Sequence, residues 1–192
     1  MDRTLSYDYH IDQLVGRCTG LLIGLSHVRY RLPKETLTTI VNALVLSTVR
    51  YCISVYGTAA AKNMSRVQKV INFGARVITR RRKHDHVSDA LRSLTWLPAR
   101  ELVAYHTLCL LKRMLVTGAP EDIAKQLSTV GQGRERSTRQ DADLTLPRIR
   151  SESGRKRFMY RAVSAFNALP LAVRKQPLGA FKNNVKRRLG HF

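Results

Sequence analysis

The sequence is poor in acidic residues. Among its 192 residues, 34 are Lys or Arg and only 13 are Asp or Glu, so the formal net charge is +21. A chain with this imbalance repels itself unless a polyanion or an acidic surface compensates the charge. Nucleic acid is the commonest partner of that kind, and we therefore expect RNA or DNA to bind here.

Cysteine is also scarce and is spaced too widely for two common structural roles. The three cysteines are Cys18, Cys52 and Cys109, and no CxxC pair occurs. A structural zinc site needs paired ligands a few residues apart, and a secreted disulfide scaffold needs an even, dense set of cysteines. Each cysteine lies within an apolar helical pattern, which predicts buried free thiols.

Long apolar runs are missing. No stretch reaches the roughly 18 residues that a membrane-spanning helix needs, because Arg50, Lys112 and Arg113 interrupt the longest candidates. The first residues contain no apolar segment of the kind found in secretory signals. We therefore expect an intracellular chain that does not bind membranes.

The residues that would support catalysis are not clustered. Two-metal phosphoryl chemistry needs grouped carboxylates, yet the chain has no Asp-Asp pair, and Asp85 and Asp89 lie outside any apolar strand pattern. The sequence has neither a GxxxxGK[ST] phosphate loop nor a GxSxG nucleophile motif. The close pair His84 and His86 lacks a third metal ligand. We predict that the isolated chain is not an enzyme and holds no metal or cofactor.

Apolar residues recur at intervals of three and four through the first 130 residues, which indicates amphipathic helices. No segment of this part alternates with period two, so the pattern predicts a helical bundle over residues 1–130. Pro33 and Pro120 suit first helical turns, and Asn63 is a candidate N-cap. The predicted helices cover residues 11–30, 33–57, 63–78, 87–94, 98–118 and a stretch beginning at 120.

The last third of the chain changes composition. Residues 131–143 have no large aliphatic side chain, which is typical of an exposed linker. Residues 144–192 carry twelve Lys and Arg against the single acid Glu152. Short strands at 144–146 and 156–160, followed by helices, predict a small basic α+β module. The expected fold class is thus mainly α, a helical bundle followed by this module.

Two groups of cations are candidate phosphate-binding residues. A helix end needs one or two cations to complement its dipole, whereas four follow one another after the third predicted helix. Phe158 and Tyr160 could stack on bases, but we favour a role in the core for both. The predicted nucleic-acid-binding residues are Arg76, Arg80, Arg81, Arg82, Lys83, Arg155, Lys156, Arg157, Arg161, Lys186, Arg187 and Arg188.

Short motifs are spread in order along most of the chain. They are Leu32-Pro33, Tyr56-Gly57, Leu94-Thr95-Trp96-Leu97-Pro98 with Arg100, Leu146-Pro147-Arg148, Phe158-x-Tyr160-Arg161 and Phe166-Asn167-Ala168-Leu169-Pro170. In this order they resemble the C-terminal part of the reverse transcriptase of non-LTR (LINE-type) retrotransposons. Within that family, the group called tick transposon proteins is the most similar.

The resemblance implies a parent protein that is an RNA-directed DNA polymerase and uses Mg²⁺. It also implies that residues 1–130 are thumb-like and grip a template–primer duplex, and that the basic C-terminal module helps to bind element RNA or target DNA. The missing palm and fingers of the parent would be partners. The family's palm motif [FY]-x-D-D and its endonuclease residues have no matching positions here, and Phe166 stands where relatives commonly carry Trp. No catalytic residue is carried over.

Three functions follow from these observations. The first is a truncated reverse transcriptase fragment that binds RNA or DNA without sequence specificity. The second is a transposon remnant with no selected activity, and the third is a small nuclease, which the scattered carboxylates disfavour. The basic runs 80–83 and 186–188 favour the nucleus, with the cytoplasm as the alternative.

Overall fold

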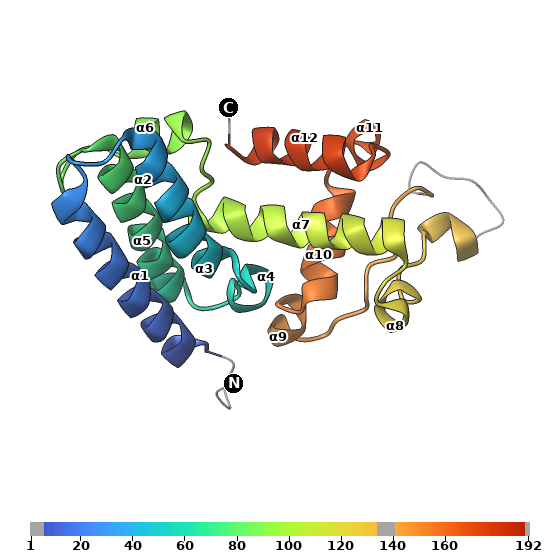
Figure 1. The fold of residues 1–192 in the computed structure, drawn as a ribbon. Helices are drawn as coiled ribbons and strands as arrows, with labels where there is room; N and C mark the ends of the chain where they lie inside the picture. The colour runs from blue at the N-terminus through green and yellow to red at the C-terminus, as the bar shows by residue number, and fades with distance from the viewer. Residues whose placement is uncertain (1–5, 134–140, 191–192) are drawn as a thin grey trace. The chain divides into compact units, whose positions relative to one another are not determined.

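The chain folds into helices, as Figure 1 shows. The computed structural model describes residues 6–133 and 141–190. Within these ranges the only β-structure is an isolated antiparallel bridge between Thr129 and Leu144. The prediction of a mainly α fold is therefore confirmed. None of the helices in these ranges is both long enough and apolar enough to cross a bilayer.

The helices form two compact units. The boundary between the units lies between Val103 and Ala104, within α7. The sequence predicts a linker later in the chain, at residues 131–143. Residues 134–140 of that linker lie outside the described residues, so the linker stays a prediction.

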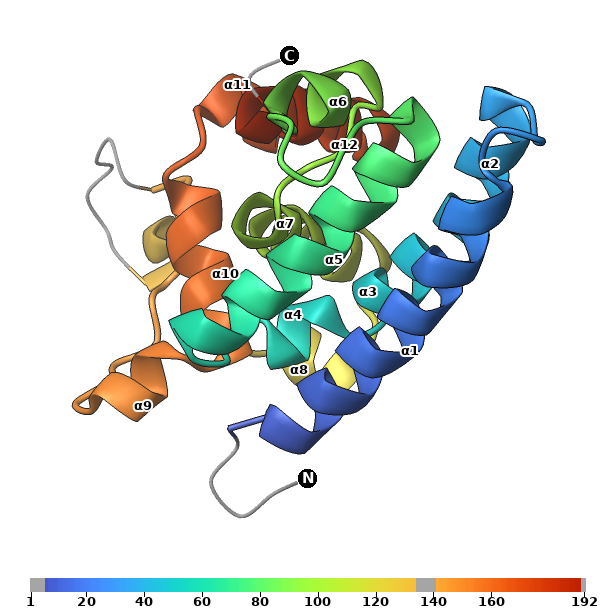
Figure 2. The same ribbon diagram turned by 90° about the vertical axis from the view of Figure 1, so that its left-hand side faces the viewer.

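The first unit is built on two long helices that run side by side, α1 and α5, with α2 packed against α5 (Figures 1 and 2). Buried side chains recur every three or four residues along both. On α1, for example, Ile11, Leu14, Cys18 and Leu22 are buried. The unit contains α1 (Asp8–Val28), α2 (Lys34–Val41), the π-helical turn η1 (Asn42–Leu46), α3 (Ser47–Arg50), α4 (Ile53–Tyr56), α5 (Ala61–Thr79), α6 (Ser88–Ser93) and the first residues of α7 (Ala99–Thr117).

Two local predictions in this unit are wrong. Asn63 does not cap a helix, because α5 begins at Ala61 and the buried Asn63 amide donates a hydrogen bond to Asp8 of α1. The predicted helix over 33–57 is also not continuous. It breaks at Tyr51 and Cys52, where Cys52 adopts a left-handed backbone conformation with φ 52° before α4 begins.

The second unit has its own apolar core, in which α7 packs with α10 and α12. The rings of Phe166 on α10 and Phe181 on α12 lie 6.0 Å apart. The partly exposed Phe158 packs against this core, as expected. The unit contains the rest of α7, α8 (Glu121–Ala124), the 3-10 turn η2 (Val130–Gly133), α9 (Glu152–Arg155), α10 (Phe158–Asn167), α11 (Leu171–Arg174) and α12 (Leu178–Gly190).

The strands predicted for the C-terminal module are wrong. The main chain of Leu144 is held by a side chain, because the Asn167 amide accepts from its N–H at 2.9 Å and donates to its carbonyl at 2.8 Å. Of residues 156–160, Lys156 and Arg157 connect α9 to α10, and residues 158–160 form the start of α10, whose buried face carries Ala162, Val163 and Phe166. Five residues are too few to distinguish period two from period 3.6. The described part of this module is helical, and its α+β assignment is not supported.

Two glycines of the first unit provide a test of this packing. A Cβ atom on Gly57 would lie 2.5 Å from the Ile53 carbonyl oxygen and 2.5 Å from a Val103 methyl, whereas one on Gly24 of α1 would meet nothing within 4 Å. Gly57→Ala should therefore destabilise the chain by about 1–3 kcal/mol through overpacking. Gly24→Ala should stabilise it by roughly 0.5–1 kcal/mol, because Ala suits a helix interior better. Urea unfolding followed by circular dichroism measures both changes, and an unchanged midpoint for Gly57→Ala would contradict the packing described.

Candidate nucleic-acid interface

A left-handed turn ends α5 and sets the direction of the basic run that follows. Arg80 follows the last residue of α5 and adopts φ 56° and ψ 26°. This left-handed conformation is common at helix ends, where the residue that adopts it is usually glycine. The Arg81 N–H then donates to the Arg76 carbonyl at 3.1 Å, which satisfies a carbonyl at the helix end. The chain folds back here, and residues 81–86 come to lie beside the last turn of α5.

An open cavity of about 440 Å³ lies beside this turn, and five cations line it. No acidic residue is among the described residues that line it. Two of the cations come from outside the run of four that the sequence singles out, Arg29 at the end of α1 and Arg76 on α5. The lining consists of Ser26, Arg29, Phe73, Arg76, Arg81, Arg82 and Lys83.

Main-chain carbonyls of the returning segment hold two of these cations. The Arg76 guanidinium donates to the Asp85 carbonyl from Nη2 at 3.0 Å and from Nε at 3.3 Å. Arg81 donates to the His86 carbonyl. A guanidinium has five N–H donors, so these carbonyls use two from Arg76 and one from Arg81. Both side chains are thus fixed in place and retain donors for an anion.

Arg82 and Lys83 are exposed, and their side chains have no hydrogen-bond or ion-pair partner within the described ranges. The nearby Asp85 carboxylate accepts from the Arg82 main-chain N–H at 2.7 Å. It supports the turn rather than either cationic side chain. These two cations therefore leave the cavity's positive charge uncompensated.

Arg29 is the cation of the cavity that is not predicted from the sequence. It follows α1 directly, and its Nη2 donates to the Tyr30 hydroxyl at 3.1 Å. Its Nε is buried and has no hydrogen-bond partner in the described part of the chain. A buried donor without a partner is unfavourable, and an anion in the cavity would supply the missing acceptor. A lone arginine 47 positions before Arg76 carries no local signal of this role.

Arg80, by contrast, does not line the cavity. Its guanidinium donates to the Leu32 carbonyl at 2.9 Å and lies 5.7 Å from the centre of the Tyr30 ring. The structure therefore gathers four of the five residues predicted in this segment and assigns Arg80 to the turn itself.

The predicted cations of the C-terminal module form two separate groups. The first group lies on α9 and the start of α10, where Arg161 Nε donates to the Lys156 carbonyl at 3.0 Å. The second lies on α12, and Figure 1 shows α9 and α12 near opposite ends of α10. The structure does not bring Arg155, Lys156, Arg157 and Arg161 together with Lys186, Arg187 and Arg188.

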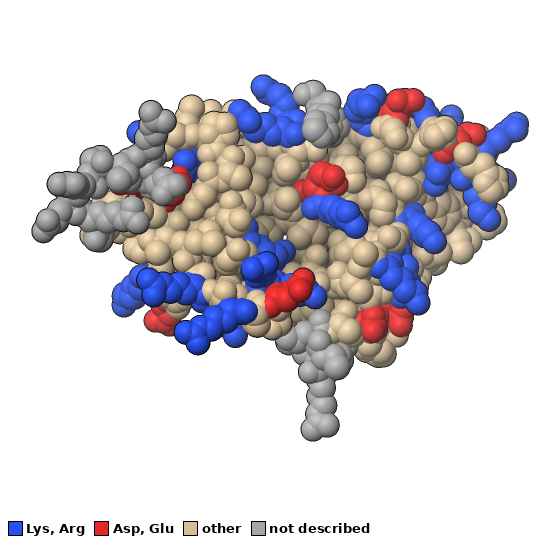
Figure 3. Space-filling model, turned by 180° about the vertical axis from the view of Figure 1, so that it is seen from behind, with Lys and Arg blue, Asp and Glu red and all other residues tan. Residues whose placement is uncertain are grey.

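Cationic side chains are widespread on the surface. On the face drawn in Figure 3, Lys and Arg side chains are scattered over the molecule with few Asp or Glu among them. One cation of the second unit is compensated, because Arg174 forms a 2.7 Å ion pair with Asp143. Its charge therefore supports the fold and is not available for a ligand.

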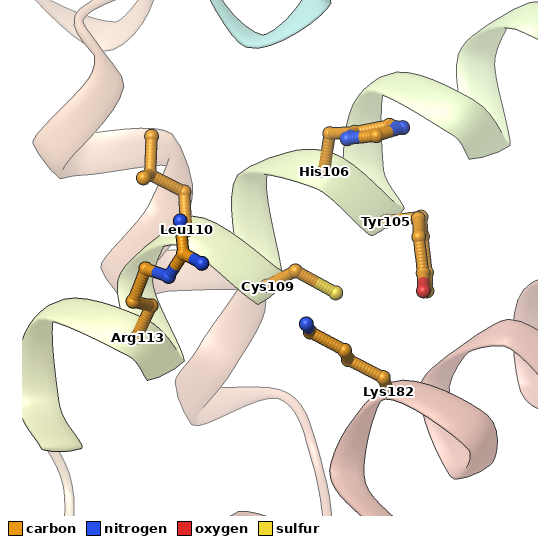
Figure 4. Close-up of a pocket in the computed structure, with 6 residues that line it drawn as sticks. All are labelled: Tyr105, His106, Cys109, Leu110, Arg113 and Lys182. Carbon is orange, nitrogen blue, oxygen red and sulfur yellow. The ribbon is translucent and has the colours of Figure 1, made fainter. Parts of the chain in front are cut away.

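A second hollow, of about 250 Å³, lies in the second unit beside α7. In Figure 4 the Lys182 amine end and the Cys109 sulfur point toward each other, with Tyr105 and His106 alongside. Burial raises the pKa of the Cys109 thiol, against smaller opposing effects of the Tyr105 hydrogen bond and the Lys182 charge. The thiol is protonated at neutral pH, which makes it a poor nucleophile.

The cysteines differ in exposure. Cys18 is buried, Cys109 is half-buried and Cys52 is exposed. The expectation of buried free thiols is thus confirmed for Cys18 and wrong for Cys52. Among the described residues, no group of three or more His, Cys, Asp or Glu gathers as metal ligands would.

Comparison with known proteins adds no family to these observations. No family model, no curated protein and no solved structure matches the chain.

The left-handed turn at Arg80 can be tested by stability. Arg80→Gly and Arg80→Ala both remove the bond to Leu32 and the contact with Tyr30, but only Gly relieves the left-handed strain. We expect Arg80→Gly to be more stable than Arg80→Ala by about 1 kcal/mol. Chemical denaturation of both variants measures the difference. Equal stabilities would show that residue 80 is not left-handed in solution.

Proposed function

We propose that this chain binds RNA or DNA through phosphate contacts, without reading the base sequence, and that the cavity at the end of α5 is its principal site. The observation that carries the proposal is the gathering of Arg29, Arg76, Arg81, Arg82 and Lys83 around one cavity whose described lining includes no acidic residue. Arginine forks suit phosphate oxygens, because they donate two parallel hydrogen bonds.

Helix-end electrostatics alone do not explain this arrangement. The negative ends of α1 and α5 favour nearby cations, and that effect accounts for Arg29 and Arg76. Arg82 and Lys83 lie beyond the helix end and are exposed. A net charge of +21 further favours a polyanion over a single small anion, since a polymer neutralises several cations at once.

The ordered motifs of the sequence extend this proposal to a parent protein. We propose that the chain is a fragment of a non-LTR retrotransposon reverse transcriptase in which the thumb-like helices and the basic C-terminal residues bind template–primer or element RNA. The support is the resemblance of the Leu94–Pro98 and Phe166–Pro170 motifs, together with the basic cavity. The chain carries no counterpart of the palm aspartates, so we do not propose polymerase activity for it.

The alternative is a transposon remnant with no selected activity. Large apolar side chains on its surface favour this alternative, since Tyr30 is 66% and Val116 59% exposed. A remnant would still bind polyanions through its net charge. It would not depend on particular cations, and the following experiment separates the two proposals on that basis.

The salt dependence of binding tests the cavity. Fluorescence anisotropy with a labelled single-stranded RNA, measured across a series of salt concentrations, gives the slope of log K against log salt. Each lost phosphate contact reduces the magnitude of this slope by roughly 0.7 for a single strand. We therefore expect Arg82→Ala combined with Lys83→Ala to reduce it by about 1.4, because both side chains are exposed and face the cavity.

The matched control is Lys62→Ala combined with Lys69→Ala. Both of these lysines are exposed on α5 and neither lines the cavity, so the control removes the same charge from a part of the first unit outside the cavity. It should change the slope by less than half as much. Equal changes of the slope in the two double variants would show that the cavity is not the principal site and that the chain binds RNA through its net charge alone.

A further inference from the structure

Two adjoining hollows form a groove between the first turns of α1 and residues 47–56. Their volumes are about 760 and 600 Å³, and both are lined by His10, Gln13 and Tyr51. We call this feature the tyrosine groove. Its remaining lining residues are Tyr7, Tyr9, Leu14, Arg17, Ser47, Thr48, Cys52, Val55 and Tyr56.

The groove has a fixed floor and exposed aromatic walls. Tyr56 is buried, its hydroxyl donates to the Val49 carbonyl, and its ring lies 5.1 Å from the His10 ring. Tyr9 and Tyr51 are each 73% exposed. The core therefore uses Tyr56, whereas Tyr9 and Tyr51 leave most of their surface to the solvent.

A left-handed residue lies close to each of these two tyrosines in the chain. Tyr7 has φ 59° just before α1, and Cys52 has φ 52° between α3 and α4. A left-handed conformation costs a non-glycine residue free energy, and such residues cluster at ligand sites. The break at Cys52 ends α3 and leaves Tyr51 extended at the groove edge.

The polar part of the groove favours an anionic ligand. Arg17 is the cation that lines it, beside Ser47 and Thr48, whose hydroxyls donate to the Ala43 and Leu44 carbonyls. The acids of this part of α1 are engaged with α5 instead, since Asp12 forms a 2.5 Å ion pair with Arg66 and Asp8 accepts from Asn63. No acidic side chain is among the described residues that line the groove.

We propose that the tyrosine groove binds unpaired nucleobases of a single strand, which stack on Tyr9 and Tyr51 while Arg17 contacts a phosphate. Exposed aromatic rings beside a cation are the usual arrangement for single-stranded nucleic acid, and they tolerate any base. This inference rests on the proposed nucleic-acid binding and adds a base-dependent part to it.

A pair of matched oligonucleotides tests the groove on the full chain. One is a labelled 20-mer of deoxythymidine and the other is an abasic 20-mer with the same phosphates. Stacking of a base on an aromatic side chain changes affinity by roughly 5- to 150-fold, so we expect the unmodified chain to bind the deoxythymidine strand at least about 10-fold more tightly. Tyr9→Ala combined with Tyr51→Ala should bring this ratio close to one without changing the affinity for the abasic strand.

Two control variants make the result specific. Tyr9→Phe combined with Tyr51→Phe retains the rings and should retain most of the ratio. Ile23→Ala combined with Val28→Ala removes exposed apolar surface from α1 outside the groove and should leave the ratio unchanged. Equal affinities of the unmodified chain for the two strands would overturn the proposal that bases stack in the groove. They would not contradict the proposed phosphate binding. Failure to bind either strand would overturn both proposals.

Cys52 reports on the same site without mutation, because it lines the groove and is exposed. We expect the deoxythymidine 20-mer to slow alkylation of Cys52 by N-ethylmaleimide at least about threefold, with the half-buried Cys109 as the internal reference. The abasic strand should protect Cys52 less. An unchanged rate at Cys52 under saturating strand would place the bases elsewhere.

Discussion

The fold has to hold like charges beside one another at the end of α5. Two unit charges 4 Å apart repel by about 1 kcal/mol in bulk water and about 4 kcal/mol near a protein surface. The structure offsets this repulsion with main-chain carbonyls, since those of Asp85 and His86 accept from Arg76 and Arg81. The left-handed turn at Arg80 brings these carbonyls into reach. The charges of the exposed Arg82 and Lys83 side chains remain uncompensated, and a polyanion would neutralise them.

The helices of the first unit are predictable from the spacing of apolar residues, because each long helix buries one face. The buried positions 11, 14, 18 and 22 of α1 show this directly. The break at Cys52 is not predictable in this way, since the apolar pattern continues through it. The strand predicted at 156–160 failed because a short run fits both periods, and the helical continuation to Ala162 and Phe166 decides between them.

The candidate site is partly visible in the sequence. A run of four cations after a helix signals a phosphate site, and three of its members do line the cavity. The exclusion of Arg80 follows from its left-handed backbone, and the inclusion of Arg29 follows from the packing of α1 against α5. Tyr9 and Tyr51 meet at one groove because α1 also packs against η1 and α3, although more than 40 positions separate the two tyrosines. Such tertiary neighbours have no local sequence signal.

The most direct measurement is footprinting of the arginines with phenylglyoxal, followed by mass spectrometry of the digested full chain with and without single-stranded RNA. If the cavity binds phosphates, Arg29, Arg81 and Arg82 become protected by the RNA. Arg100, which is exposed and lies outside the cavity, stays reactive and serves as the reference. Protection of Arg100 to the same extent, or unprotected cavity arginines at saturating RNA, would contradict phosphate binding at the end of α5.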